Sequence, residues 1–192
     1  MPAVSADSWR RVGAVAVMIV AAMAVVVFWA RPAHEPARLD KAVPVAVTSL
    51  NPTDLAFLQL MISLDNSALP LFGLMQADPA VQAVATSGAD GHRGELTALR
   101  AALTGGGGIE DGSQHAGHDL PGMVLEGDLA AVRAAAPAQR PAEALKVLRD
   151  HLAGTTSLAT SEGKAGFDPA TKAAAAAILD THTKLLAQLP VM

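Results

Sequence analysis

The sequence predicts an all-α protein, in which two similar helical hairpins form an antiparallel four-helix bundle that follows an N-terminal transmembrane helix. Three observations lead to this prediction. The chain has 192 residues that are 51% hydrophobic but only 3% aromatic, so Ala, Leu and Val must build the core, and Ala and Leu are strong helix formers. An uncharged segment lies near the N-terminus, and the sequence after it matches itself when it is shifted by 90 residues.

Residues 12–30 form the uncharged segment, which follows a short tail of residues 1–11. A helix of that length spans about 28 Å, close to the roughly 30 Å hydrocarbon core of a bilayer. The two tryptophans of the chain, Trp9 and Trp29, lie at its two ends, where aromatic side chains prefer the headgroup region. We therefore expect residues 12–30 to contact the membrane as a single-pass anchor.

A cleaved signal peptide is the alternative interpretation of this segment. Signal peptides have apolar stretches of about 7 to 15 residues and small residues before the cut, whereas this segment is longer and has Phe28 and Arg31 at those positions. We expect an uncleaved signal anchor in the cell membrane, with the C-terminal domain on the extracytoplasmic side. A proline-rich spacer at residues 31–53 should hold that domain away from the bilayer.

Residues 54–192 make up the predicted bundle, and they contain an internal duplication. The halves 54–103 and 141–192 align without a gap, with thirteen identities over positions 54–102. A repeat of this length indicates duplication of one supersecondary unit. Residues 104–140 join the halves as a crossover.

Each half has the pattern of a helical hairpin. Apolar residues at i, i+3 and i+7 follow Asp54 and predict one buried face. Asp78-Pro79 and Asp168-Pro169 are expected to start the second helix of each half, with Asp as the N-cap and Pro at the first helical position. The helices are expected at residues 54–73, 79–103, 141–163 and 169–189, with a short helix at 124–136.

His92 and His182 occupy equivalent positions of the two halves. Each is followed by a leucine at i+4 and at i+7, so both imidazoles should face the core. Two such histidines could bind a metal ion if they met, but we expect no third imidazole or carboxylate nearby, and two ligands alone make a poor site. We therefore expect a pair of buried histidines hydrogen-bonded to backbone or serine groups, with the metal site as the alternative.

The glycine-rich crossover carries a second set of candidate metal ligands, His115, His118 and Met123. Imidazole and thioether groups suit copper. Ordering a loop costs conformational entropy, so we expect a solvated loop, with weak or adventitious metal binding as the alternative. We therefore expect no bound cofactor, with copper as the alternative.

The composition disfavours several classes of function. The chain has no Cys, which excludes thiolate metal sites and cysteine nucleophiles. Its net charge of −4 gives no basic stripe for a phosphate backbone, so we expect no nucleic-acid partner. No Ser-His-acid arrangement or pair of carboxylates on one apolar face is evident, and we predict that the protein is not an enzyme.

Three segments, taken in order, resemble a known family. They are DLAFLQLMISLDNSALPLFGL from Asp54, GHRGELTALRAAL from Gly91 and LPGMVLEGDLAAV from Leu120. Together with the second copy that follows, they resemble the domain of unknown function 305 (DUF305) family over residues 51–189. This resemblance implies a ferritin-like four-helix bundle on the extracytoplasmic side.

The resemblance is incomplete where the family has paired histidines, in the first helix of each half. Some relatives are thought to use those imidazoles for copper or other metals, but this chain has Leu64-Asp65 and Gly154-Thr155 in their place. The resemblance therefore implies a bundle that keeps its packing and lacks those ligands. Other positions of the family pattern are occupied by Met61, Ala68, His92, Glu95 and His151.

The predicted function is a non-catalytic binding or scaffold module, accessory to a membrane-protein complex. The alternative is a periplasmic or cell-surface copper-binding protein that uses His92, His182 and the histidines of the crossover. The oligomeric state does not follow from the sequence.

Overall fold

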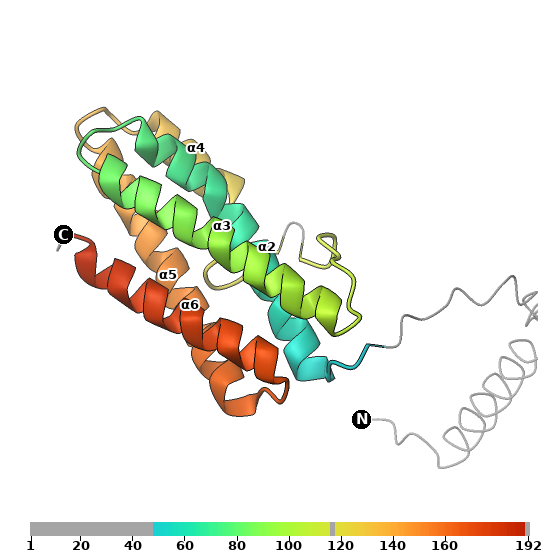
Figure 1. Cartoon of the computed structure of the whole chain (residues 1–192). Coiled ribbons are helices and arrows are strands. Elements are labelled where there is room, and N and C mark those ends of the chain that lie inside the picture. Colours follow the sequence, from blue (N-terminus) through green and yellow to red (C-terminus); the bar gives the residue numbers. More distant parts are fainter. Residues whose placement is uncertain (1–47, 116–117, 191–192) are drawn as a thin grey trace, which may run out of the picture. The chain divides into compact units, whose positions relative to one another are not determined.

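In the computed structural model of the chain, residues 48–115 and 118–190 are described, and they form five α-helices and no strand (Figure 1). The helices are α2 (Pro52–Gln76), α3 (Gln82–Gly105), α4 (Glu126–Ala134), α5 (Arg140–Ala165) and α6 (Pro169–Gln188). The prediction of an all-α protein is confirmed for these residues, and the four long helices lie where the sequence pattern placed them.

The four long helices pack as a bundle of two hairpins. Helix α2 packs against α3 and α5, and α6 packs against α3 and α5, so each helix has two neighbours (Figure 1). The C-terminal part of α2, the N-terminal parts of α3 and α5 and the C-terminal part of α6 share one apolar cluster. Neighbouring helices therefore run antiparallel, as in other four-helix bundles.

The crossover from α3 to α5 runs from one end of the bundle to the other, because α3 ends at the opposite end of the bundle from the start of α5. The side chain of Gln59 on α2 holds it, donating to the carbonyl of Ile109 at 2.5 Å and accepting from the N–H of Asp111 at 3.1 Å. Further along, α4 buries Leu129 and Val132 against the end of the bundle.

The two Asp-Pro pairs behave differently. Asp168 is the N-cap of α6, and its carboxylate accepts the N–H of Thr171 at 2.8 Å, as predicted. Asp78 is not an N-cap, because its carboxylate accepts the N–H of Ala80 at 2.9 Å and closes a turn. Helix α3 therefore begins at Gln82, three residues later than the sequence predicted.

A polar layer divides the bundle core into two apolar clusters. One cluster includes Phe72, Ala85, Leu148 and Leu185, and the other includes Leu58, Leu99, Ala159 and Ile178. On every long helix, buried polar or charged side chains lie between the members of the two clusters. These side chains are Asp65, His92, Glu95, His151, Thr155 and His182.

The predicted tail 1–11, the anchor 12–30 and most of the spacer 31–53 lie outside the described residues. In the described part of the chain, α2 is long and apolar enough to cross a membrane by length and composition. More than half of its apolar window, 56%, is buried inside the bundle, which makes α2 a core helix.

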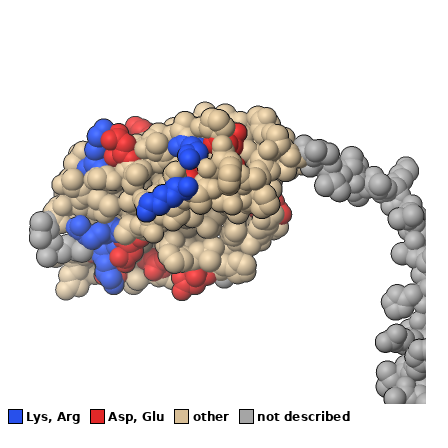
Figure 2. Space-filling view, turned by 90° about the horizontal axis from the view of Figure 1, so that it is seen from below, with Lys and Arg blue, Asp and Glu red and all other residues tan. Residues whose placement is uncertain are grey.

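Charged side chains of both signs lie on the molecular surface. In the view of Figure 2, Lys and Arg alternate with Asp and Glu and leave wide areas without charge. Five exposed or partly exposed ion pairs join such residues, for example Arg93 with Asp90 at 2.8 Å. This face offers no continuous basic surface for a phosphate backbone.

Candidate metal centre

The polar layer brings together four side chains that can ligate a metal ion. Asp65 comes from α2, His92 and Glu95 come from α3, and His182 comes from α6. Their ligand atoms all lie within 4.8 Å of one another, and each side chain is buried. Among residues 48–115 and 118–190, this is the one group of three or more His, Asp or Glu with such spacing.

A third imidazole, that of His151 on α5, joins this group through His92. The two Nε2 atoms lie 2.9 Å apart. The Nδ1 atom of His92 lies 2.9 Å from the Gly88 carbonyl oxygen, and that of His151 lies 2.7 Å from the Gly122 carbonyl oxygen. Because a carbonyl oxygen can only accept, both Nδ1 atoms carry their ring's proton, and in neutral rings the two Nε2 lone pairs face each other.

Burial favours the neutral form of both rings. It lowers the pKa of His92 to about 3 and that of His151 to about 4, and the nearby ring of His182 adds to the lowering in each case. A contact between two lone pairs is unfavourable unless a positively charged group lies between or beside them.

The turn at Gly122 positions His151. Gly122 has φ +88°, a left-handed conformation that favours glycine, and it packs against Gly154 on α5. A Cβ atom on Gly154 would lie 2.5 Å from the Gly122 backbone nitrogen. The Pro-Gly-Met segment of the crossover therefore comes close to α5 and delivers the carbonyl that holds His151.

His182 is held between a hydroxyl and a carboxylate. Its Nδ1 lies 2.8 Å from the Thr155 hydroxyl oxygen, and its Nε2 lies 2.9 Å from Oε2 of Glu95. The ring of His182 also stacks on that of His92, with centroids 4.9 Å apart and an interplanar angle of 15°. Both rings are thereby fixed in orientation, which a ligand sphere requires.

Asp65 is a buried carboxyl group on which the only positive charge that acts, among the described residues, is that of Arg100. Its side chain is 0% exposed, and within the described part of the chain neither carboxylate oxygen has a hydrogen-bond partner. Burial, and next the charge of Glu95, raise the pKa of Asp65 well above its ordinary value. Oε1 of Glu95 also lacks a partner there. Buried polar atoms are nearly always paired, so two such carboxylates call for an explanation, and an ion bound between them supplies one.

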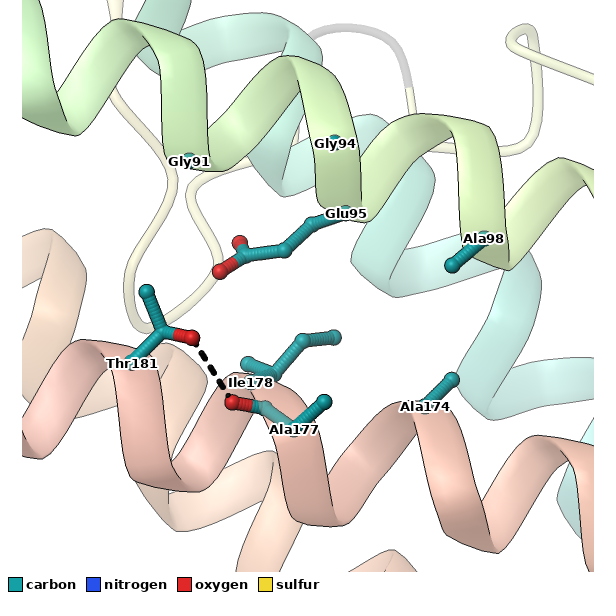
Figure 3. A pocket seen from close by; sticks show the side chains of 8 residues that line it. All are labelled: Gly91, Gly94, Glu95, Ala98, Ala174, Ala177, Ile178 and Thr181. Atoms are coloured by element: carbon teal, nitrogen blue, oxygen red, sulfur yellow. Dashed lines mark hydrogen bonds between the residues drawn. The ribbon is translucent and has the colours of Figure 1, made fainter.

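A small pocket between α3 and α6 leads from the surface to Glu95 (Figure 3). It has a volume of about 230 Å³, and Glu95 and Ile178 lie between walls of glycine and alanine. The remaining candidate ligands have almost no exposed surface.

The candidate metal ligands predicted from the sequence lie in two separate places in the structure. His92 and His182 face the core, as predicted, and their rings stack on each other. The expectation that no third imidazole or carboxylate lies near them is wrong. Nε2 of His151 lies 2.9 Å from that of His92, and Oε2 of Glu95 lies 2.9 Å from Nε2 of His182. Asp65 has an oxygen within 4.8 Å of the other ligand atoms.

The crossover residues His115, His118 and Met123 lie apart from this centre. They line a separate surface pocket of about 410 Å³ beside α2, and His118 is exposed. Their role in copper binding stays a prediction.

Sequence reasoning missed three residues of the centre, although the 90-residue shift contained a signal for them. The shift pairs Met61 with His151, Asp65 with Thr155 and Glu95 with Leu185, and all six of these positions are buried. The positions that face the centre are thus the same in both halves, while the residue types differ.

Comparison with known proteins supports the fold. No protein-family model matches the sequence, and no curated protein matches it significantly. The structure is similar to the crystal structure of a DUF305 fragment from Deinococcus radiodurans, with a TM-score of 0.62 and 20% sequence identity over 72% of this chain and 93% of that one. This similarity confirms the bundle fold and supports the resemblance to the DUF305 family.

Proposed function

We propose that the bundle binds one divalent transition-metal ion in its polar layer, with Asp65, His92, Glu95 and His182 as ligands and His151 beside them. The observation that carries this proposal is Asp65, a fully buried carboxylate whose two oxygens have no hydrogen-bond partner among the described residues. An uncompensated buried charge is costly. An ion at the centre of the four ligand atoms would remove that cost.

The charge of the site favours a dication. Asp65 and Glu95 contribute two negative charges when ionised, and neutral imidazoles contribute none. An ion of charge +2 gives a neutral centre, whereas Cu(I) leaves a buried negative charge and a trivalent ion leaves a positive one. The set of nitrogen and oxygen donors, without a thiolate, suits zinc, iron, cobalt, nickel or copper in the divalent state.

This site differs from the predicted copper alternative in one respect. The predicted alternative joined His92 and His182 to the histidines of the crossover, but His115 and His118 line a different pocket. The proposed ligands all come from the four-helix core. The predicted accessory role in a membrane complex, without catalysis, is compatible with a metal centre of this kind and stays a prediction.

The experiment is a metal titration of the full chain in mild detergent. Zn(II) and Co(II) are the probes, because Cu(II) binds most nitrogen and oxygen sites tightly and discriminates poorly. We expect one ion per chain, and a Co(II) spectrum typical of nitrogen and oxygen ligands. Replacing His182 by Ala should weaken binding at least about tenfold.

The matched control removes imidazoles from the crossover instead of the core. The double variant His115→Ala with His118→Ala should bind Zn(II) with unchanged affinity and stoichiometry. Absence of stoichiometric binding in the unmodified chain would contradict the proposal. So would loss of binding in the crossover variant together with full binding in His182→Ala.

A further inference from the structure

We infer that the groove between α3 and α6 is the path by which the ion enters and leaves the buried centre, and that Glu95 is the ligand that meets the ion first. This inference rests on the metal site proposed above and adds a route to it.

The candidate ligands differ in their access to solvent. Asp65 and His182 are 0% exposed and His92 is 1% exposed, whereas Glu95 is 8% exposed. Glu95 lines the pocket of about 230 Å³ between α3 and α6, and its Oε1 has no hydrogen-bond partner in the described part of the chain. Glu95 thus combines an unpaired carboxylate oxygen with a place in the wall of a surface pocket, and it is suited to capture a cation.

The groove is open because its walls carry small side chains. Gly91, Gly94 and Ala98 form the wall on α3, and Ala174 and Ala177 face them from α6 (Figure 3).

Close packing does not demand these glycines. A Cβ atom on Gly94 would meet nothing within 4 Å, and one on Gly91 would meet only the Thr181 methyl group at 3.7 Å. At Gly88, one turn before His92, a Cβ atom would overlap the Phe72 ring. Gly88 is therefore needed for packing, whereas Gly91 and Gly94 leave space that larger side chains could fill.

A second pocket continues the groove toward His92. It has a volume of about 240 Å³ and shares Gly91 and Thr181 with the first. His92 lines this pocket as Glu95 lines the other. On the α2 side of the centre, Asp65 is fully buried. On the α5 side, the Gly122 turn covers His151 and accepts a hydrogen bond from its ring. The α3–α6 groove is thus the side on which the centre approaches solvent.

The test is to fill the groove and to measure rates as well as affinity. Gly94→Leu and Ala98→Leu each place a large side chain on the α3 wall and leave every proposed ligand residue unchanged. Gly73→Leu is the matched control for Gly94→Leu, because a Cβ atom there also meets nothing within 4 Å and the residue lies on α2, away from the groove. Both Gly→Leu changes raise helix propensity by a similar amount, so folding is preserved equally in the two.

To measure loading, the metal-free full chain in mild detergent is mixed with Zn(II) and a chromophoric chelator. To measure release, excess chelator is added to the loaded chain. We expect Gly94→Leu and Ala98→Leu to slow loading and release by about tenfold each, with a Kd within about threefold of the original, because a blocked path changes both rates alike. Gly73→Leu should change neither rate.

The outcomes separate this inference from the proposed function. Stoichiometric binding with unchanged rates in both groove variants would overturn the α3–α6 path and leave the metal site standing. A higher Kd without slower association would also overturn the α3–α6 path, because the groove substitutions would then change the stability of the bound complex and not the access to it. Absence of binding in the unmodified chain would remove the metal site and the path together.

Discussion

His92 and His151, which are 59 positions apart in the sequence, face each other in the bundle core with their Nε2 atoms 2.9 Å apart. Each ring donates its Nδ1 proton to a backbone carbonyl, that of Gly88 or that of Gly122. The backbone therefore fixes which nitrogen of each ring is free, and the two free nitrogens face each other.

Replacing His151 by Met tests how much the second ring contributes to ion binding. Met occupies the equivalent position of the other half, at Met61, where it is fully buried, so the variant should fold. We expect Zn(II) affinity to fall by about 10- to 100-fold, the usual effect of losing a ligand or a group that orients one. A chelator competition assay measures this change. Unchanged affinity would show that His151 supports the core only.

Replacing Asp65 by Asn should stabilise the metal-free protein and abolish its stabilisation by metal. Asn has nearly the same shape, and unlike the carboxyl group it cannot become charged at this buried position, where the side chain has no described hydrogen-bond partner. We expect the free energy of unfolding in excess chelator to rise by about 1 to 3 kcal/mol. Thermal unfolding with and without Zn(II) checks both parts. A less stable metal-free variant would mean that the carboxylate is already compensated in the protein alone.

Gly88→Ala and Gly94→Ala form a matched pair in the same helix. A Cβ atom added to Gly88 would meet the Phe72 ring, whereas one added to Gly94 would meet nothing within 4 Å. We expect Gly88→Ala to lower the free energy of unfolding by about 1 to 2 kcal/mol because of overpacking. Gly94→Ala should raise it by up to about 1 kcal/mol through helix propensity. Urea unfolding measures both, and equal effects would contradict the packing assigned to Gly88.

Glu162 should contribute less stability as pH rises from about 4.5 to about 7. His92 and His151, whose pKa values are lowered to about 3 and about 4 from 6.5, contribute in the opposite direction over part of this range. Burial, and then a hydrogen bond to Asp54, raise the pKa of Glu162 to about 7 from 4.5. Between these values the folded state holds a proton that the unfolded state releases, so the contribution of Glu162 to stability falls as pH rises. The effect is about 3 kcal/mol at most.

The groups around Glu162 come from three parts of the fold. Asp54 on α2 accepts the N–H groups of Phe167 and Asp168 at 2.9 and 3.1 Å, and the charges of Asp168 and Lys172 act on Glu162 with opposite sign. In Glu162→Gln the amide keeps a donor for Asp54 and carries no charge. Relative to the unmodified chain, its free energy of unfolding should increase between pH 5 and pH 8. Parallel pH profiles would refute the role of Glu162.

The bundle fold could be predicted from the sequence because the sequence patterns that indicate it are local. Apolar spacing, the Asp168 cap and the 90-residue shift each act within one helix or between copies of one hairpin. The Asp78 cap failed for a local reason as well, because a side chain that can cap a helix can also close a turn, and at Asp78 the turn is formed.

Three of the five side chains at the candidate metal centre did not follow from the sequence. The positions of His92 and His182 were predictable from the leucines on the same helix face. His151, Asp65 and Glu95 were not, because their meeting depends on how far each helix is shifted along its neighbours. Charged residues also rarely lie in a core, so the pattern of buried positions gave no reason to expect Asp65 or Glu95 there.

The two halves of the predicted duplication contribute different groups to the candidate metal centre. Of the four pairs of equivalent inward positions, only His92 with His182 is still alike, and the first copy holds both acids while the second holds the extra base. A dimer of the first copy alone would gather four acidic groups in one interior, and a dimer of the second would gather none. The candidate centre therefore needs both hairpins, because one supplies its acids and the other supplies the second and third imidazoles.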